Sequence, residues 1–505
     1  MKSLFTVHRG PLRTIAPHPN AIRTWALVSC AALFVISPAL ADDEDVDDLM
    51  GGFDDDFDVS ILEDLEEEMP AWIAALPGGK ILYERVELSG SIAAGAVWNY
   101  LSHTVPDGHG AGGRTDYGGL SRLDLDGFLQ LDIELPGDWQ IRAEALGWYD
   151  FVYRIQGRNG YNGAVLDVYE WQVDSGEVYL TGPLHENVDI TAGRKIVNWG
   201  RSDTFRVVDV INPLDQKEPG LVDIEDLRRP VVMVKLDATA GPWSAQFMVI
   251  PEHRYDRLPP PGSDFYPEAL ASGPFARNIE TNRRSDFTGT PGLAGKIDGR
   301  FSGWDFSIYG AYVDENSFTL DFEPTTGLRF EPNRIGMFGA GANYTRGPWL
   351  VKAEFAWLSN YSVLRIDPIP PGGVFRHERD RIDSMIGIEY YGPDQLTLAL
   401  EIVNRHFLKY PGDTALLEIQ EQSDFETGLR ISRPFFRERL DVTLLGVAFG
   451  EDLRDGGIFR ASADFELTDS WKLEGGWIVY FGGPRDGLGS FDSNDRIFGK
   501  VKYSF

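Results

Sequence analysis

The chain has 505 residues, of which 47 are Lys or Arg and 78 are Asp or Glu, giving a formal net charge of -31. This charge excludes a nucleic-acid binder that works by neutralising phosphates, and the single cysteine excludes a disulfide framework and thiolate metal sites. A hydrophobic content of 43% is too high for a disordered chain, and no apolar run beyond the N-terminus reaches the roughly 18 residues of a membrane helix.

Residues 1–41 have the layout of a secretory signal peptide. They contain four basic residues and no acidic one, then an apolar stretch over 25–36 and the small-residue site Ala39-Leu40-Ala41. We therefore expect export and a mature chain that begins at Asp42. The only cysteine, Cys30, lies within this segment.

Residues 42–79 form an acidic leader in the periplasm. Between residues 42 and 68 there are fifteen acidic residues and no basic one. A block of like charge repels itself and is usually solvated, so a flexible tail is the plainest interpretation. Interspersed Leu49, Phe53 and Leu65 also suit a short helix that docks on a periplasmic or inner-membrane transporter partner. Calcium binding by the acids at 54–58 is a third interpretation, although the glycine-centred loop of a dedicated site is missing.

From about residue 80 to residue 505 the sequence alternates between apolar and polar residues. Examples are the stretches at 141–150, 396–405, 459–467, 471–481 and 496–505. A period of two predicts strands, and one apolar face with one charged face suits either a water-facing sheet or a barrel with lipid outside.

Loop lengths decide between a barrel and a two-sheet secreted protein. Short connections are predicted at 135–138, 182–188, 241–242, 302–303, 347–348, 392–394, 432–439 and 468–470. Longer polar connections at 104–118, 157–173, 199–228, 252–290, 316–332, 366–378, 410–422, 451–456 and 483–494 alternate with them. This asymmetry is typical of outer-membrane barrels with short periplasmic turns and long extracellular loops. We predict an all-β, transmembrane antiparallel β-barrel over 80–505 with about 18 strands (16–18).

The end of the chain and its aromatic residues agree with that fold. Tyr503 and the C-terminal Phe505 close an alternating strand, as in the segment that barrel-assembly machinery recognises in outer-membrane proteins. Aromatic residues such as Trp243, Trp349 and Trp471 gather at strand ends, as interfacial girdles do. The expected location is therefore the outer membrane of a Gram-negative bacterium, in contact with its lipid and lipopolysaccharide.

Charged residues are expected to line or narrow the lumen. Neighbouring opposite charges suggest the pairs Arg142 with Glu144, Glu401 with Arg405, Lys472 with Glu474, and Arg460 with Asp464 and Glu466. They are expected to form ladders across neighbouring strands, and they either only solvate the wall or act as a selectivity filter. The candidates for the constriction and lumen are Arg194, Arg201, Asp203, Asp209, Asp215, Asp226, Arg228, Glu401, Arg460, Lys472 and Lys500.

The most distinctive stretch runs from Gly193 to Pro230. It is long, dense in opposite charges and rich in turn-forming Asn-Pro and Pro-Gly pairs, with a short helix expected at 222–228. Long loops in compact proteins are usually functional or disordered, and the Ile, Val and Leu residues here favour order. We expect this loop, at about 200–228, to fold inward as a constriction, a plug or a gate; a plain structural loop is the alternative.

Several motifs resemble a proteobacterial outer-membrane family, domain of unknown function family 1302. They are Gly-Arg-x-Ile-Val-Asn-Trp-Gly at 193–200, Asn-Pro-Leu-Asp at 212–215, Ser-Asp-Phe-Tyr-Pro at 263–267 and the acidic start at 51–55. The resemblance implies a large β-barrel, distantly similar to alginate-export barrels. It also implies trafficking of hydrophobic compounds beside inner-membrane transporters of the resistance-nodulation-division type. It implies no catalytic or ligand-binding residues.

Enzyme motifs are missing from the sequence. There is no H-E-x-x-H, G-x-S-x-G or P-loop, and the eight histidines are scattered. We expect no enzyme activity, no cofactor and no metal. The predicted function is an outer-membrane channel or transporter for a small or hydrophobic solute. The alternatives are a surface-exposed structural or adhesive barrel, acting through 252–290 with Pro259 to Pro261, and a hydrolase using His103 or His109 with Asp107 and Asp116.

Overall fold

The computed structural model describes residues 85–107, 113–222, 226–266, 286–317, 319–323, 327–331, 333–364, 376–409, 421–483 and 491–505. The chain divides into two units, 1–68 and 69–505, and every described residue belongs to the second. The predicted signal peptide (1–41) and acidic leader (42–79) lie outside the described residues, so both stay predictions.

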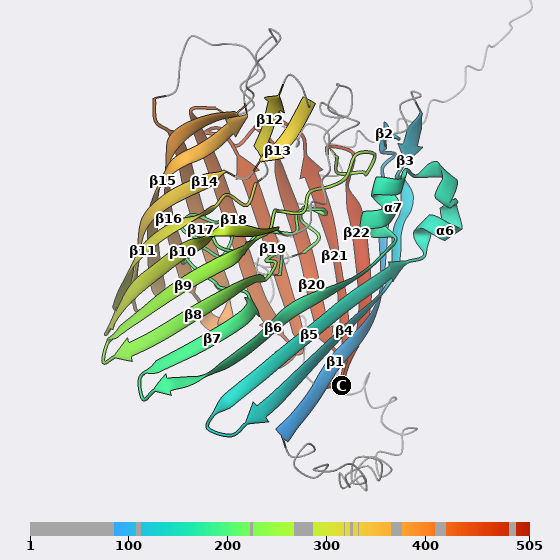
Figure 1. Cartoon of the computed structure of the whole chain (residues 1–505). Coiled ribbons are helices and arrows are strands. Elements are labelled where there is room, and N and C mark those ends of the chain that lie inside the picture. The colour runs from blue at the N-terminus through green and yellow to red at the C-terminus, as the bar shows by residue number, and fades with distance from the viewer. Residues whose placement is uncertain are drawn as a thin grey trace, which may run out of the picture. The chain divides into compact units, whose positions relative to one another are not determined.

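Within the described residues, eighteen antiparallel strands form one sheet that closes on itself (Figure 1). The strands are β1 (Val86–Asn99), β4 (Gly119–Leu135), β5 (Trp139–Asp150), β6 (Trp171–His185), β7 (Val188–Lys195), β8 (Val231–Ala240), β9 (Trp243–His253), β10 (Asp286–Phe301), β11 (Trp304–Asp314), β14 (Arg334–Arg346), β15 (Trp349–Leu364), β16 (Arg376–Tyr391), β17 (Thr397–Phe407), β18 (Ser423–Phe435), β19 (Leu440–Phe449), β20 (Gly457–Glu466), β21 (Trp471–Phe481) and β22 (Arg496–Ser504). The predicted antiparallel barrel of about 18 strands is confirmed.

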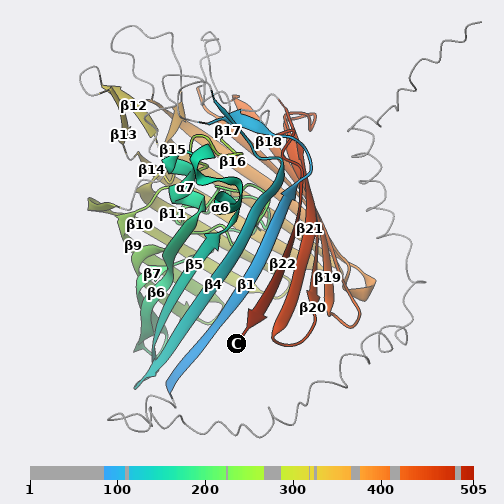
Figure 2. The same cartoon turned by 90° about the vertical axis from the view of Figure 1, so that its right-hand side faces the viewer.

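The barrel closes between its first and last strands. β1 lies between β4 and β22 (Figure 2), with Ser91 opposite Ser504 and Asn99 opposite Arg496. The backbone of Phe505 extends this pairing, because its amide donates to the Gly90 carbonyl at 3.0 Å and its carbonyl accepts from the Gly90 amide at 2.9 Å. Closure leaves no unpaired sheet edge at this seam.

Smaller elements lie in the connections. They are the strand pairs β2 (Thr104–Pro106) with β3 (Arg114–Asp116) and β12 (Thr319–Glu323) with β13 (Gly327–Glu331), the helices α6 (Val152–Gln156) and α7 (Gly163–Tyr169), and the 3-10 turns η1 (Arg158–Gly160) and η2 (Pro393–Gln395). α7 begins after Asn162, whose side chain accepts the Val165 amide as an N-cap. Of the helices in the described part of the chain, none is long and apolar enough to cross a membrane.

Short and long connections alternate around the barrel, as the sequence predicts. The tight turns include Gly241-Pro242, Ser302-Gly303 and Gly347-Pro348, in which each glycine has a positive φ that suits a two-residue turn. We call the end of the barrel that carries these turns the short-turn end, and the opposite end the long-loop end. The N-terminal end of β1 and the C-terminal end of β22 both lie at the short-turn end, because the number of strands is even.

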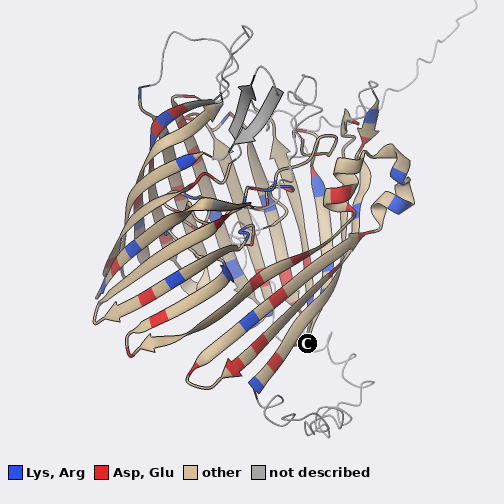
Figure 3. Ribbon diagram, in the orientation of Figure 1, with Lys and Arg blue, Asp and Glu red and all other residues tan. Residues whose placement is uncertain are grey.

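Side chains alternate between the outside of the barrel and its interior. In β15, Phe355 and Trp357 are exposed, whereas Glu354, Ala356 and Leu358 are buried. The exposed residues of neighbouring strands are also apolar, including Phe338, Ile386, Ile388, Leu400 and Ile402. Charged residues recur along the strands (Figure 3), and those with buried side chains, such as Lys352 and Glu401, share the inner face. An apolar outer wall with a charged interior is the arrangement of a membrane barrel.

Tryptophan marks the short-turn end. Five strands, β5, β9, β11, β15 and β21, begin with Trp immediately after a short turn. The Trp349 ring packs on Tyr390 with centroids 4.7 Å apart, and the Trp471 ring packs on Tyr503 at 5.0 Å. Aromatic rings with an apolar body and a polar edge favour a membrane–water boundary, so this girdle indicates one boundary of the lipid-facing band.

Candidate functional site: the inner segment of the barrel

The connection between β7 and β8 runs through the barrel interior (Figure 1). We call residues 196–230 the inner segment; its residues 223–225, and with them part of the helix expected at 222–228, lie outside the described residues. The contacts of the inner segment are with buried side chains of β4, β11, β14, β15, β17 and β21, on the inner face of the wall. The stretch that the sequence predicts to fold inward therefore does lie inside the barrel.

Glu401 of β17 is a buried carboxylate that accepts three hydrogen bonds from the inner segment. Ser202 Oγ donates at 2.6 Å, and the backbone amides of Asp203 and Thr204 donate at 3.0 and 3.1 Å. Lys352 Nζ lies 3.9 Å from Glu401 and 2.6 Å from Asp203 Oδ2. A buried carboxylate needs both donors and a counter-charge, so this arrangement fixes the segment against β15 and β17.

Arg201 makes a second set of contacts with the wall. Its backbone amide donates to the Glu354 carboxylate of β15, and its guanidinium donates to Ser307 Oγ at 2.7 Å and pairs with Asp305. A Cβ at Gly341 of β14 would lie only 3.0 Å from Arg201 Nε. The glycine thus leaves the space that the arginine occupies.

Apolar residues of the inner segment pack on an apolar part of the inner wall. The Trp199 ring lies 5.3 Å from the Tyr309 ring, and Trp199 Nε1 donates to Gln246 at 3.4 Å. Val208 is fully buried against Gly339. The cluster comprises Val197, Trp199, Phe205, Val207, Val208 and Ile211 with Val231, Met233, Met248, Ile250, Ala294, Tyr309, Val313, Ile335, Met337, Ala356, Leu358, Met385 and Val403. Part of the barrel interior therefore contains a packed hydrophobic core in place of open lumen.

One asparagine joins the two ends of the inner segment. Asn212 is completely buried, and its side-chain oxygen accepts the Val197 amide at 2.8 Å. Its side-chain nitrogen donates to the Lys195 carbonyl at 3.2 Å and to the Arg229 carbonyl at 2.9 Å. All hydrogen bonds that the amide makes here are to backbone, so this residue closes the base of the loop.

The tip of the inner segment reaches the opposite wall. Glu218 pairs with Arg122 of β4 at 2.7 Å, and the Pro219 carbonyl accepts from the Tyr480 hydroxyl of β21 at 2.6 Å. The Lys217 carbonyl accepts from the hydroxyl of Tyr169 in α7. Because β4 lies opposite β15 in the closed order of eighteen strands, the segment spans the lumen.

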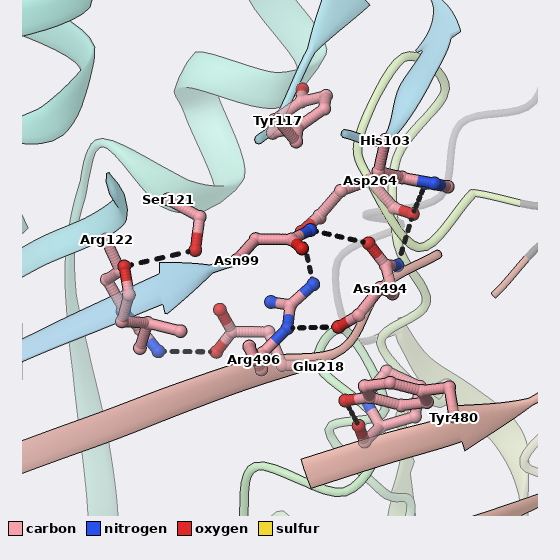
Figure 4. Close-up of polar contacts among 12 residues, drawn as sticks. Asn99, His103, Tyr117, Ser121, Arg122, Glu218, Asp264, Tyr480, Asn494 and Arg496 are labelled. Atoms are coloured by element: carbon pink, nitrogen blue, oxygen red, sulfur yellow. Dashed lines mark hydrogen bonds and ion pairs between the residues drawn. The ribbon is translucent and has the colours of Figure 1, made fainter. Parts of the chain in front are cut away.

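A second loop, residues 254–266, also folds inward, and we call it the second inner loop. Figure 4 shows Asp264 beside Asn494 and Arg496. Arg496 Nη2 donates to Asp264 Oδ2 at 3.1 Å, while the Asp264 carbonyl accepts from Asn494 Nδ2 at 2.8 Å and bonds His103 Nε2 at 2.9 Å. Phe265 packs on Tyr480. These contacts hold the loop against the seam between β1 and β22.

Several cations gather where the two inner segments meet. Arg257 donates to Asp215 at 2.9 Å and to Asp174 Oδ2 at 3.2 Å, and Arg254 and Arg229 lie 3.7 and 4.0 Å from that same oxygen. Burial, followed by repulsion from Arg257 and Arg254, lowers the pKa of Arg229 to about 9. Burial also lowers the pKa of Arg254. This basic cluster therefore carries more positive charge than its two carboxylates balance.

A cavity of about 620 Å³ remains between the inner segment and the inner wall of β14–β18. Its lining residues include Val207 and Asp209 from the segment and Leu358, Arg405 and Glu426 from the wall. The cavity lies toward the long-loop end, because Leu358 and Arg405 belong to the parts of β15 and β17 farthest from their short turns.

Most of the residues predicted from the sequence take part in these contacts. Asp209 pairs with Arg228 at 2.9 Å, Asp215 with Arg257, and Arg194 with Glu252 and with Ser175 Oγ. Arg201, Asp203 and Glu401 hold the segment to the wall as described above. Asp226 is exposed at the end of the segment.

Three candidates lie on the wall strands β20, β21 and β22. Lys472 lies 3.3 Å from Asp464 and 3.9 Å from Glu474, and Lys500 pairs with Asp126. Arg460 lies over the Phe498 ring. The predicted membrane-assembly residues Tyr503 and Phe505 are partly exposed on the outside of β22 and just beyond it.

Most of the predicted charges pair across neighbouring strands, as a ladder would, and not with the partner named on the same strand; Lys472 and Glu474 lie 3.9 Å apart as expected. Glu401 pairs with Lys352, and Arg405 pairs with Asp383 at 2.7 Å and with Glu426 at 2.9 Å. Residues four apart on a strand are about 13 Å apart, whereas residues facing each other on adjacent strands lie about 5 Å apart. For the same reason Arg142 pairs with Asp132, which lies opposite it on β4, and Asp464 pairs with Lys472 of β21.

Sequence reasoning missed several residues that hold the inner segment. Lys352 and Glu354 alternate with apolar residues in β15, and Asp383 and Arg405 do the same in β16 and β17. That alternation marks them as inward-facing, but it does not show that a loop will reach them. Arg122 and Tyr480 likewise contact the segment only through its tip.

The geometry gives no support to a hydrolase site at His103. Its Nδ1 lies 2.8 Å from Ser493 Oγ and its Nε2 contacts the Asp264 carbonyl, so neither nitrogen bonds Asp107 or Asp116. His109 lies outside the described residues. No group of three or more His, Cys, Asp or Glu residues placed to hold a metal ion occurs in the described ranges.

A comparison with known protein families finds one match. The model of the family described as Protein of unknown function (DUF1302) matches residues 22–505. A comparison with curated proteins finds no match. The family match does not extend to alginate-export barrels, so that likeness stays a prediction.

Solved structures that resemble the chain include OccAB1 of Acinetobacter baumannii, with 10% identity, a TM-score of 0.47 and coverage of 83% of this chain and 96% of that one. OccK8 (OprE) of Pseudomonas aeruginosa has 8% identity and a TM-score of 0.45, with coverage of 84% and 98%. The outer membrane channel DcaP of Acinetobacter baumannii has 11% identity and a TM-score of 0.39, with coverage of 83% and 97%. With scores this low, the function of this chain has to be inferred from its own residues.

Proposed function

We propose, from the premise that the chain belongs to the family described as Protein of unknown function (DUF1302), that it is an outer-membrane channel for a small or hydrophobic solute. The observation that carries the proposal is a closed barrel with an apolar, exposed outer wall and a charged interior that the inner segment crosses. Such a wall is stable only where lipid covers it, and such an interior suits passage of a polar or amphipathic solute.

The inner segment is proposed to set the size of the passage. It is held at Glu401 and Glu354 on one side and at Arg122 and Tyr480 on the other, so a solute must pass around it or displace it. The polar contacts at these four residues can be exchanged for water, whereas the apolar cluster around Trp199 and Val208 holds the segment to the wall. The same arrangement disfavours an adhesive role for 252–290, because Pro259 and Pro260 in this stretch are buried inside the barrel.

The test is single-channel conductance of the full chain, purified from the outer membrane of an expressing cell and placed in planar bilayers. Replacing residues 203–226 by a short Gly/Ser linker is expected to raise conductance at least about twofold, because the lumen loses its crossing segment. Unchanged conductance in an inserted, heat-modifiable variant would remove the constriction from the proposal. Absence of current in both proteins would remove the channel itself.

Glu474→Gln serves as the matched control. Glu474 faces the interior near the short-turn end and lies 3.9 Å from Lys472. Its neutralisation changes wall charge and leaves the segment in place. We expect its conductance to stay close to that of the wild type, so a change in the linker variant alone can be assigned to the segment.

Partners follow from the proposed location. We infer contact with outer-membrane lipid and lipopolysaccharide along the apolar wall, and insertion by the barrel-assembly machinery. The acidic leader is proposed to dock on a periplasmic or inner-membrane transporter partner. Removing residues 42–79 after the signal peptide should leave conductance unchanged and abolish co-purification with such a partner; loss of conductance would place the leader in the channel.

A further inference from the structure

The cavity beside the inner segment has a strongly unbalanced charge. Its volume is about 620 Å³, and its charged lining residues are the cations Arg206, Arg381 and Arg405 and the carboxylates Asp209, Asp256, Glu315, Asp383, Glu421, Asp424, Glu426 and Asp455. The carboxylates outnumber the guanidiniums by more than two to one. A concave surface lined by one sign of charge raises the local concentration of the opposite ion.

The arginines of the lining are already engaged with carboxylates. Arg381 donates twice to Asp383, at 2.7 Å each, and its guanidinium lies 3.7 Å from the Tyr361 ring centroid. Arg405 bridges Asp383 and Glu426. Bidentate and bridging pairs of this kind leave little positive field for an incoming anion.

A buried carboxylate in the lining has an unused acceptor. Asp209 has only 5% of its surface exposed; its Oδ2 is shared by Arg228 at 2.9 Å and Arg206 at 3.3 Å. Its other oxygen, Oδ1, has no hydrogen-bond partner among the described residues, and neither does Arg206 Nη2. Buried polar atoms are normally paired, so Asp209 leaves a hydrogen-bond acceptor unused where its side chain lines the cavity.

The basic groups of the inner segments lie elsewhere. The basic cluster consists of Arg229, Arg254, Arg257 and Lys217 around Asp174 and Asp215, and none of these six residues lines the cavity. Leu214 and Gln216 of the inner segment do line it. The segment therefore divides the interior into a basic side toward β6 and an acidic side toward β14–β18.

The acidic side also has apolar wall. Leu358, Tyr361 and Phe407 contribute to the lining, with Ile335, Val207 and Val210. Tyr361 and Phe407 lie next to each other, with ring centroids 6.1 Å apart. An apolar floor under acidic groups suits a ligand that has both an apolar body and a positive charge.

We propose that this cavity selects organic cations, namely amines with an apolar body, over anions of the same size. This inference rests on the proposed channel function and names its solute class. Glu421, Asp424 and Asp455 attract the cation at the long-loop end, the aromatic floor binds its body, and the carboxylate of Asp209 adds negative charge beside it.

The experiment compares two ions of similar size in planar bilayers containing the full chain. Phenethylammonium and phenylacetate are tested for permeability by zero-current potential, and phenethylammonium for block of the potassium current. For the wild type we expect the cation to be favoured on the order of tenfold, with saturable block from the long-loop side. The combined variant Glu421→Gln, Asp424→Asn, Asp455→Asn should reduce that preference to about twofold or less.

A control variant and the opposing outcomes keep the two proposals separate. Asp464→Asn removes an inward-facing acid near the short-turn end, outside the cavity, and should leave the preference unchanged. Potassium currents with equal permeability for the two organic ions would overturn cation selection and leave the channel standing. A preference for the cation that persists in the combined variant would likewise overturn cation selection by this cavity and leave the channel standing. Absence of any current in the wild type and in the linker variant would overturn the channel and this inference together.

Discussion

At the scale of single residues, the interior of the barrel is organised by buried carboxylates that receive backbone amides. Glu401 accepts two amides and a hydroxyl, and Glu354 accepts the Arg201 amide. In strands that face water, such acids would merely solvate the wall. Here each satisfies donors of a chain segment that has no strand partner, so a wall acid takes the place of a neighbouring backbone carbonyl.

This predicts a specific effect of Glu401→Ala. Removing the carboxylate leaves the amides of Asp203 and Thr204 without their acceptor and Lys352 with one fewer counter-charge. We expect a loss of about 1–3 kcal/mol in the stability of the segment's attachment. The measurements are protease cleavage between residues 203 and 222 and current noise in single-channel recordings, both of which should rise.

Glu474→Ala is the control for that prediction, because among the described residues its carboxylate forms an ion pair with Lys472 on the same strand. Its protease pattern should match the wild type. Equal resistance of the Glu401 and Glu474 variants would mean that the apolar packing of Trp199 and Val208 holds the segment without help from the carboxylate.

At the scale of elements, two connections become part of the interior; the sequence predicts this for the inner segment and does not predict it for the second inner loop. The inner segment and the second inner loop contribute buried residues such as Val208 and Phe265, while the strands contribute the surface on which they pack. The Asn-Pro and Pro-Gly pairs of the inner segment predict turns. They could not show which wall the turns would face, because that depends on strands distant in the sequence.

The second inner loop should respond to acid through His103. Burial lowers the pKa of this residue below its usual 6.5, ahead of the smaller raising effect of Asp264. The negative charges of Asp264 and Asp116 raise the pKa of His103, and the positive charge of Arg496 lowers it further. Because the folded pKa is depressed, the neutral ring favours docking above pH 6.5, and this contribution is lost as pH falls below 6.5.

Protection of residues 254–266 from hydrogen exchange should therefore decrease between pH 7.5 and pH 5 in the wild type. His103→Gln should flatten that dependence, since glutamine does not titrate. His185→Gln, at an exposed position beside a short turn, should keep it. An unchanged pH profile in the His103 variant would assign the effect to another group.

At the scale of the whole molecule, eighteen strands and one seam define the barrel. The seam between β1 and β22 is continued by the backbone bonds of Gly90 and Phe505. The Phe505 side chain is half exposed on the outer surface, next to Tyr503. Its ring is thus free to be recognised before the barrel closes, whereas its backbone serves closure itself.

Two variants separate recognition from closure. Phe505→Ala keeps the backbone bonds to Gly90, so any loss of inserted barrel would reflect recognition by the assembly machinery. Deleting residues 503–505 also removes the seam bonds and the Trp471–Tyr503 contact. We expect several-fold less heat-modifiable protein in the outer membrane for the first variant and less still for the second. Normal amounts of the Phe505 variant would contradict the predicted assembly signal.

The sequence by itself determined the number of strands, their turns and which side chains face out. These properties are local: a period of two, a turn glycine or an initial Trp each acts over a few residues. Only the tertiary structure decided which charges meet. Ser202 and Glu401 are 199 residues apart and Asp203 and Lys352 are 149 apart. Such contacts exist because closure of the barrel brings β15 and β17 opposite a loop from β7, and no local pattern encodes that distance.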